Sequence, residues 1–257
     1  MSAKLARLSG GVPILMYHLV SPERPPAFHS YTVTAADFRL QVRALSRLGC
    51  TAVSPDDVLA AQRGGRPLPR RAVVITFDDG FQHCLRHAAP VLHEAGFQAT
   101  MYVVAGLLGG TSRWMADLGL DLPLVSAAEV RELEQAGVRC ESHSMTHPRL
   151  ASLDMAGIRE ELTRSRSTLE DIVGHEVRHL AYPHGSYDGR VREEALDAGY
   201  RTAYTTRPSK AVLVDDPLAM PRVKVDGRDG GRDFLARLVT GKDAGYPARR
   251  ILGRTRA

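Results

Sequence analysis

Two pairs of polar side chains in this sequence have the types and the spacing of a metal site. Asp78 and Asp79 follow an apolar, β-branched stretch and precede a glycine. His143 and His147 lie four residues apart, which puts both imidazoles on one face if the segment makes a helical turn. One carboxylate and two imidazoles leave coordination positions open, and a catalytic divalent metal needs such open positions.

Each pair also has a simpler explanation when it is taken alone. Asp79 and the glycine after it form a dipeptide that is common in turns. A histidine pair at this spacing is often incidental, and Pro148 disfavours continued helix at His147. The combination favours a metal site, because both pairs follow predicted strands and the C-terminal ends of parallel strands meet on one side of a barrel or sheet.

Short apolar stretches alternate with helical stretches along the chain. The strands are predicted at Val12–Tyr17, Thr51–Val53, Ala72–Phe77, Ala99–Val104, Val138–Ser142, His179–Tyr182, Arg201–Thr206 and Arg222–Val225. The helices are predicted after the caps Thr34, Ser54 and Ser126, and over Cys84–Ala95, Asp154–Val173 and Asp188–Ala198. This alternation is typical of parallel β/α units in a barrel or a doubly wound sheet, and no repeat or linker divides the chain.

Taken together, the two motifs resemble those of the polysaccharide deacetylases of the NodB-homology type (carbohydrate esterase family 4). A Thr-Phe strand end with Asp78-Asp79 is followed about sixty residues later by His-Ser-x-x-His-Pro, and the resemblance spans roughly 12–225. It implies an α/β fold, a distorted (β/α) barrel, as a single catalytic domain over 12–226. An N-terminal extension at 1–11 would precede this domain and a basic C-terminal tail at 227–257 would follow it. The implied activity is hydrolysis of N-acetyl groups in N-acetylhexosamine-containing glycans, with release of acetate.

The resemblance also implies roles for the residues of the two motifs. Asp79, His143 and His147 would hold a divalent metal, with zinc preferred to cobalt or nickel. The metal would activate a water molecule and polarise the acetyl carbonyl. Asp78 would be the general base that takes a proton from the attacking water.

A third stretch matches a family motif that often reads Arg-Pro-Pro-Tyr-Gly. The resemblance implies that it contacts the substrate and, through the backbone N–H of position 184, the oxyanion; its residues are Tyr182, Pro183, His184 and Gly185. Ala181 stands where the motif often has the arginine that orients the base. Arg222, which follows a Met-Pro pair, is the candidate for that role, and a surface arginine is the alternative.

The source of the general acid also departs from the usual family pattern. The late Leu-x-His motif is absent, since no histidine follows His184. A Leu-Met-Tyr-His stretch instead ends the first predicted strand at His18, and it resembles the permuted subgroup of exopolysaccharide deacetylases. We therefore assign His18 as the acid that protonates the leaving amine, with a structural histidine as the alternative. Trp114, the only tryptophan, is either a sugar-stacking wall or a core residue.

The net charge of +5 is concentrated near the C-terminus. Residues 222–257 contain ten Lys or Arg and four Asp, a balance of +6. We expect such a basic tail either to contact an anionic surface or to be solvated. No nucleic-acid-binding motif accompanies the charge, so no nucleic-acid partner is expected. The absence of a signal peptide and of a transmembrane stretch predicts a cytoplasmic protein, and three scattered cysteines do not predict a disulfide framework.

Two other functions stay open on the sequence alone. A deacetylase of the same chemistry that acts on a small or lipid-linked acetylated sugar inside the cell fits the absence of a signal peptide. A catalytically silent carbohydrate-binding relative fits the missing arginine of the third motif. A serine hydrolase is not supported, because the sequence has no G-x-S-x-G elbow.

Overall fold

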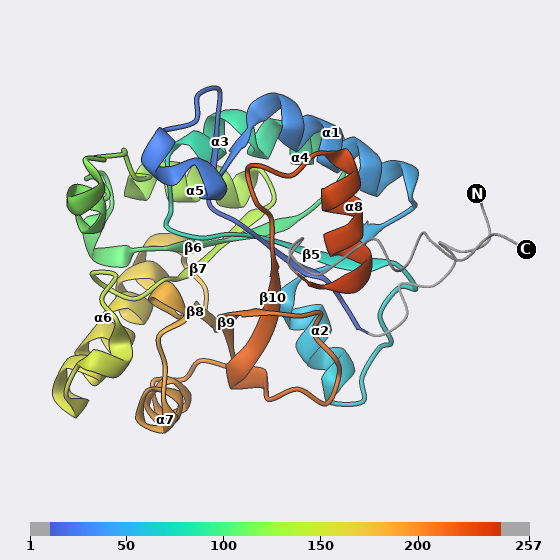
Figure 1. Cartoon of the computed structure of the whole chain (residues 1–257). Coiled ribbons are helices and arrows are strands. Elements are labelled where there is room, and N and C mark those ends of the chain that lie inside the picture. The colour runs from blue at the N-terminus through green and yellow to red at the C-terminus, as the bar shows by residue number, and fades with distance from the viewer. Residues whose placement is uncertain (1–10, 243–257) are drawn as a thin grey trace, which may run out of the picture.

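Seven parallel strands close into a barrel in the computed structural model, which describes residues 11–242 (Figure 1). Around the wall they run in the order β5, β6, β7, β8, β9, β10 and β1, and β1 pairs with β5 to close the barrel. Their bounds are β1 Ile14–Tyr17, β5 Ala72–Phe77, β6 Ala99–Val103, β7 Val138–Ser142, β8 His179–Ala181, β9 Thr202–Pro208 and β10 Met220–Lys224. This arrangement confirms the distorted (β/α) barrel expected from the sequence.

The wall is distorted at β5, where one edge is shared by two neighbours. β4 (Thr51–Ala52) pairs with the start of β5, at Ala72 and Val73. β6 pairs with the end of β5, at Thr76 and Phe77, while β1 pairs along the opposite edge. The end of β5 is therefore hydrogen-bonded on both sides, which fixes the direction in which the next residues leave the strand.

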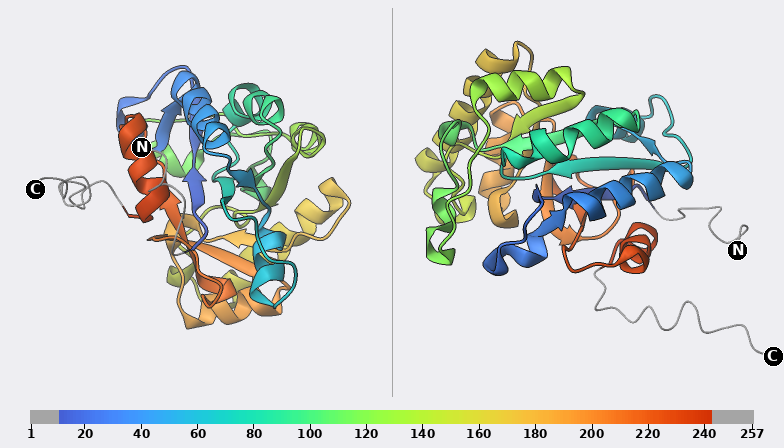
Figure 2. Two further views of the ribbon diagram at one scale, coloured as in Figure 1. Left: turned by 90° about the vertical axis from the view of Figure 1, so that its right-hand side faces the viewer. Right: turned by 90° about the horizontal axis from the view of Figure 1, so that it is seen from above.

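Helices cover the outside of the barrel (Figures 1 and 2). Their bounds are α1 Ala35–Arg47, α2 Pro55–Gln62, α3 His83–His87, α4 Ala89–Glu94, α5 Ala127–Gln135, α6 Met155–Val173, α7 Gly189–Asp197 and α8 Gly231–Thr240. Ser54 and Ser126 each form a capping box with an acidic residue three positions later, and the Thr34 hydroxyl caps α1. These contacts confirm the predicted starts of three helices, and each cap contributes about 1 kcal/mol.

Both faces of β5 are buried, as its continuous apolar sequence predicts. Ile75 and Phe77 belong to the large cluster between the strands and the helices. Val74 belongs to a smaller cluster that also contains Tyr102 and Tyr204. Because side chains alternate along a strand, this smaller cluster fills the inside of the barrel.

The helical segment predicted roughly over Cys84–Ala95 is present but interrupted. The chain forms two short helices, α3 and α4, and bends at Ala88, which has φ −104° and ψ −48°. Pro90 explains the break, because proline lacks the backbone N–H that would continue the helix and its ring clashes with the carbonyl four residues earlier.

A second, two-stranded sheet beside the barrel was not predicted. β2 (Leu19–Ser21) and β3 (Thr32–Thr34) pair in parallel, and a 3₁₀ segment, Pro26–Tyr31, lies between them. Each strand has three residues, too few for the alternation of side chains to show in the sequence. The segment brings Tyr31 against His18, with their ring centroids 4.8 Å apart.

α8 lies within the stretch 227–257 that we predicted to be a basic tail. Its Phe234 and Leu238 are buried in the large core cluster, and the helix packs against α1 and β10. The first part of the expected tail is therefore packed against the barrel. Its apolar face is short and lies among charged residues, so the sequence pattern did not predict a helix there. Residues 1–10 and 243–257, with the expected contact between the tail and an anionic surface, lie outside the described residues.

The three cysteines, Cys50, Cys84 and Cys140, are buried and form no disulfide. This agrees with the prediction that they do not make a disulfide framework. Within residues 11–242, no helix combines the length and the apolar character needed to cross a membrane.

We expect Gly227→Ala to lower the free energy of unfolding by about 1–3 kcal/mol. A Cβ at this position would lie 2.0 Å from the carbonyl oxygen of Thr32 and 2.3 Å from that of His29. Both are backbone atoms of the segment that carries Tyr31, so no side-chain rotation relieves the clash.

Gly189→Ala at the start of α7 is the matched control, because nothing lies within 4 Å of the added Cβ and alanine favours a helix. Urea unfolding measures both variants. Wild-type stability in Gly227→Ala would contradict the close packing of the segment against the end of β10.

Candidate active site

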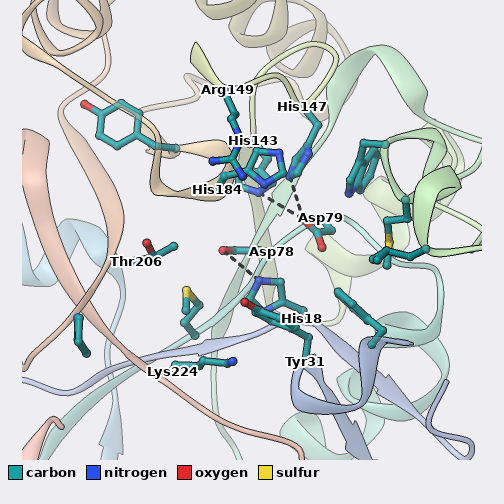
Figure 3. Close-up of a pocket in the computed structure, with 17 residues that line it drawn as sticks. His18, Tyr31, Asp78, Asp79, His143, His147, Arg149, His184, Thr206 and Lys224 are labelled. Carbon is teal, nitrogen blue, oxygen red and sulfur yellow. Dashed lines mark ion pairs between the residues drawn. The ribbon is translucent and has the colours of Figure 1, made fainter. Parts of the chain in front are cut away.

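A cavity of about 520 Å³ opens at the C-terminal ends of the barrel strands (Figure 3). The ends of β1, β5 and β7 bring to its wall five of the residues predicted to act: His18, Asp78, Asp79, His143 and His147. The expectation that these strand ends meet is therefore confirmed.

Asp79, His143 and His147 form a cluster of metal-ligand types. One donor atom from each lies within 4.8 Å of the other two, and no other such group occurs in the part of the chain that the structure describes. Nε2 of His143 lies 3.4 Å and Nε2 of His147 lies 3.3 Å from the same atom, Oδ1 of Asp79. All three side chains are buried. Three donor atoms thus converge on one point that solvent hardly reaches.

The second nitrogen of His143 fixes the direction of the first. Nδ1 lies 2.7 Å from the carbonyl oxygen of Ala181 on β8. A carbonyl oxygen only accepts, so Nδ1 carries a hydrogen, and Nε2 is the nitrogen that faces Asp79. Metal-ligating histidines commonly have such an outer hydrogen-bond partner. The orientation of the His143 ring is therefore one in which it could bind a metal.

The two histidines meet through a loop and not through the helical turn that we expected. Residues 143–148 have no helical structure, yet the rings of His143 and His147 lie with centroids 4.9 Å apart. Glu161 on α6 holds the loop, because its carboxylate accepts from the backbone N–H groups of Met145 and Thr146, both at 2.9 Å. Sequence reasoning missed Glu161, since one glutamate in an amphipathic helix carries no local signal.

Left-handed backbone conformations are concentrated at this cavity. Apart from glycines, four residues of the described chain have positive φ: Asp79 at 75°, Ser144 at 65°, His147 at 66° and His184 at 58°. Three of the four line the cavity, and Ser144 lies between His143 and His147 in the sequence. Such conformations cluster at functional sites, where the surrounding structure holds them in place.

The electrostatics of the cluster favour an ionised Asp79. Burial opposes its ionisation, but the imidazoles of His143 and His147 beside the carboxylate hold the pKa of the carboxyl well below its usual value. Burial lowers the pKa of His147, against the effect of Asp79. A carboxylate and a neutral imidazole are the states in which these side chains bind a metal.

Arg222 pairs with Asp78 beneath the cavity. Nη1 donates to Oδ1 at 2.7 Å and Nη2 donates to Oδ2 at 2.6 Å, a bidentate arrangement. Nε donates to the carbonyl of Thr205 at 3.1 Å, and the fully buried guanidinium lies 5.7 Å from the ring centre of Tyr102. Burial opposes ionisation of Asp78, but Arg222 outweighs it and the pKa of the carboxyl is lowered. Arg222 is therefore not a surface arginine and contacts the residue that we expected it to orient.

His18 lies next to Asp78 in the cavity (Figure 3). Its Nε2 is 4.0 Å from Oδ2 of Asp78. Burial lowers the pKa of His18, while the carboxylates of Asp79 and Asp78 raise it. This position at the cavity wall, next to the expected base, distinguishes His18 from a histidine of the core.

The third predicted stretch supplies two side chains to the wall, Tyr182 and His184. Burial, and then the neighbouring His147, lower the pKa of His184 to about 4, and the rings of these histidines lie 4.6 Å apart. The Tyr182 hydroxyl does not face the cavity, because it donates to the carbonyl of Leu218 at 2.9 Å.

Pro183 and Gly185 shape the backbone of this stretch and do not line the cavity. Gly185 has a φ of 66°, and a Cβ there would lie 2.2 Å from the hydroxyl oxygen of Thr206, which does line it. The glycine therefore allows β9 to approach the third stretch closely.

Trp114 combines features of the two alternatives that we considered for it. Its ring stacks on that of His147, with centroids 4.3 Å apart and planes at 27°, and it also lines the cavity. It is half-buried, and the neighbouring Met115 and Leu118 extend the same wall. Trp114 thus packs against His147 and presents an aromatic surface beside it.

Further residues of the wall that were not identified from the sequence include Phe28, Tyr31, Arg149, Thr206 and Lys224. Arg149 had the strongest available signal, because it follows the second motif directly. The others lie on segments that carry no motif, and only the folded arrangement brings them to the cavity.

The chain is similar to known proteins that are described as deacetylases. A family model described as polysaccharide deacetylase matches residues 65–203. The protein YxkH of Bacillus subtilis is 25% identical over 225 residues, which cover 88% of this chain and 75% of that one. A chitooligosaccharide deacetylase of Rhizobium leguminosarum is 28% identical over 59% of this chain and 67% of its own. The Streptococcus pyogenes deacetylase PplD shares the fold, with a TM-score of 0.78, 22% identity and coverage of 89% of this chain and 98% of that chain.

We expect Arg222→Met to lower the free energy of unfolding by about 3–5 kcal/mol, because it leaves Asp78 buried without its partner. Arg222→Lys should recover part of this loss, since an ammonium group cannot make the two parallel hydrogen bonds. Chemical unfolding of each variant measures the effect.

Arg164→Met is the control for the loss of an arginine. Arg164 pairs with Glu160 on the surface of α6, with both side chains 60% exposed, and its removal should change stability by less than about 1 kcal/mol. Equal losses in Arg164→Met and Arg222→Met would contradict the structural role of the buried pair.

Proposed function

The chain belongs to the polysaccharide deacetylase family, and from this premise we propose that it is a metal-dependent hydrolase that removes N-acetyl groups from N-acetylhexosamine-containing glycans. One observation carries the proposal. A single cavity joins the cluster of Asp79, His143 and His147 to Asp78, which Arg222 holds from below. A protein that only binds carbohydrate needs neither a metal-ligand cluster nor a buried carboxylate that a guanidinium keeps ionised.

The donor set supports a divalent metal as cofactor. Two imidazoles and one carboxylate suit zinc, and cobalt or nickel accept the same ligands. When bound, such a metal supplies the Lewis acidity that activates water and polarises the acetyl carbonyl. The buried position of His143 and His147 keeps their rings in place before the metal binds.

Asp78 is the general base in this proposal. Arg222 engages both of its carboxylate oxygens, which fixes the plane of the carboxylate toward the cavity. The lowered pKa keeps Asp78 ionised near neutral pH, as a general base must be. Its sequence neighbour, Asp79, belongs to the metal-ligand cluster, so the base lies beside the residues that would hold the metal.

His18 is the general acid. In the reaction, the water oxygen bonds to the acetyl carbon, the carbon–nitrogen bond breaks, and the electron pair left on nitrogen takes a proton from His18. The products are acetate and a free amine. His18 Nε2 and Asp78 Oδ2 lie 4.0 Å apart, which is longer than a hydrogen bond, so the two side chains must approach before the proton taken by the base can return to the acid.

The backbone N–H of His184 is the donor that we propose for the oxyanion. His184 lies beside His147 at the cavity, and its left-handed conformation is one that few residues other than glycine adopt. A backbone donor does not depend on the side chain, so the histidine in place of the family's tyrosine leaves this role intact.

The cavity supports a sugar as the substrate. Its volume of 520 Å³ lies in the range of small-ligand sites, and Trp114 offers an aromatic face for the apolar side of a pyranose ring. The resemblance to a chitooligosaccharide deacetylase agrees with an N-acetylglucosamine unit as the reacting sugar. A small or lipid-linked acetylated sugar would undergo the same chemistry, and only the length of the accepted substrate separates the two.

We expect the full chain to release acetate from N-acetylglucosamine oligomers when it is reconstituted with equimolar zinc or cobalt, and to release none after treatment with a chelator. Monomer to hexamer are compared, because the preferred length separates a small substrate from a glycan. Trp114 reports metal binding by fluorescence, since it is the only tryptophan and stacks on His147. Bound metal without acetate from any oligomer would contradict the hydrolase and support a silent carbohydrate-binding protein. Failure to bind metal would contradict the site itself.

We expect Asp78→Asn to retain the metal and to lose turnover by about 10²–10⁴-fold, the usual contribution of a general base. His143→Ala should lose both metal and turnover, because it removes a ligand. His93→Ala is the control, since His93 is exposed on α4 and does not line the cavity. Metal content and acetate release are measured for all three. Undiminished turnover in metal-loaded Asp78→Asn would overturn the assignment of the base.

A further inference from the structure

The cavity wall carries two basic side chains, Arg149 and Lys224. They lie on opposite sides of the predicted catalytic residues (Figure 3). Neither has a role in hydrolysis of an acetamide as described above, so their presence needs another explanation. Their surroundings differ, and this difference shows which of the two is available to a ligand.

Lys224 has partners within the protein. Its Nζ lies 3.6 Å from a carboxylate oxygen of Asp226 and 3.8 Å from the ring centre of Tyr31. The carboxylate compensates its charge, and the aromatic face adds a second favourable contact. Lys224 is therefore used mainly to support Tyr31 in the wall.

Arg149 has no such partner. In residues 11–242, no carboxylate forms an ion pair with its guanidinium and no hydrogen bond of that group is found. The side chain is exposed to the cavity, and it lies close enough to His184 for its charge to help lower the pKa of that ring. The guanidinium thus points to the substrate space with its donors free.

The backbone of Arg149 is nevertheless held firmly. It follows His147 and Pro148 and precedes Leu150, which is fully buried. Its carbonyl oxygen accepts from the Ser152 hydroxyl at 2.6 Å. A charged side chain on a fixed backbone next to a metal-ligand residue is a suitable element for specificity, because its reach is limited to one part of the cavity.

The charge balance of the wall leaves Arg149 uncompensated. The acidic residues of the wall are Asp78 and Asp79. Asp78 is already paired with Arg222, and Asp79 belongs to the metal-ligand cluster. A divalent metal would make the cavity more positive still. Such a potential attracts anions and gives no advantage with a neutral glycan, which offers only hydroxyl and acetamide groups.

We propose that Arg149 binds an anionic substituent, a carboxylate or a phosphate, of the glycan on which the site acts. This inference rests on the proposed function, and it names the substrate class as an acidic glycan. The planar guanidinium matches both anions, because its parallel N–H groups pair with two oxygens at once. The sugar ring would lie against the aromatic wall, with its charged group directed toward Arg149.

Equilibrium binding tests the inference without requiring turnover. The full chain, treated with a chelator so that no substrate is consumed, is titrated with three tetramers of equal length. One is the neutral N-acetylglucosamine tetramer, one alternates N-acetylglucosamine with N-acetylmuramic acid, and one carries a phosphate monoester. Trp114 fluorescence follows binding, and the two acidic tetramers distinguish a carboxylate from a phosphate as the preferred group.

We expect wild type to bind at least one acidic tetramer about ten-fold or more tightly than the neutral one, the effect of one charge-assisted bidentate contact. Arg149→Gln should lose this preference and bind the neutral tetramer as wild type does. Arg43→Gln, which removes an exposed arginine of α1, is the charge-matched control and should keep the preference. Equal binding of all three tetramers, no binding of any, or an equal loss for neutral and acidic tetramers in Arg149→Gln would overturn the inference.

Acetate release by the metal-loaded chain tests the proposed function separately. Absence of acetate together with an Arg149-dependent preference would overturn the reaction and keep the anion site. Acetate release with no preference among the tetramers would keep the reaction and overturn the anion site.

Discussion

The buried ion pair between Arg222 and Asp78 is the interaction on which the arrangement of the site depends. It joins β10 to the end of β5, two strands that are separated by β1 in the barrel wall. Moving both charges out of water is costly, and the bidentate geometry offsets that cost together with the hydrogen bond from Arg222 to Thr205. Because the pair holds Asp78 from inside the barrel, the next residue, Asp79, is directed to the histidines. One contact thus separates the roles of two adjacent carboxylates.

The left-handed backbone conformations around the cavity follow from the different directions in which Asp78 and Asp79 point. Asp79 must leave a fully hydrogen-bonded strand and turn at once, and it does so with a φ of 75°. His147 has a φ of 66° and ends a loop that Glu161 holds in place. Conformations of this kind cost about 1–3 kcal/mol each, and they persist only where the surrounding contacts hold them. The packed barrel therefore keeps the three donor atoms together before a metal binds, which limits the rearrangement that binding requires.

Short-range patterns predicted most of the barrel, because the residues that decide them are neighbours in sequence. The apolar stretch Ala72–Phe77 and the capping box at Ser126 are examples, and both are found as expected. The two motifs were also local. The pairing of Arg222 with Asp78 spans 144 positions, and only the family resemblance pointed to it. The roles of Glu161 and α8 could not be predicted from the sequence. A glutamate on a helix has the same local pattern whether or not it binds a loop, and a short apolar face has the same pattern whether or not it packs against a core.

The position of Arg222 also explains how the site functions without the arginine of the third motif. Ala181 is fully buried and belongs to the cluster inside the barrel with Tyr102 and Tyr204. The guanidinium of Arg222 already lies over the Tyr102 ring and engages both oxygens of Asp78. A second arginine at 181 would find the carboxylate occupied and would leave an unpaired charge in an apolar interior, which is strongly unfavourable. The small side chain is therefore the complement of the arginine on β10, and the carbonyl of Ala181 keeps its own role by accepting from His143.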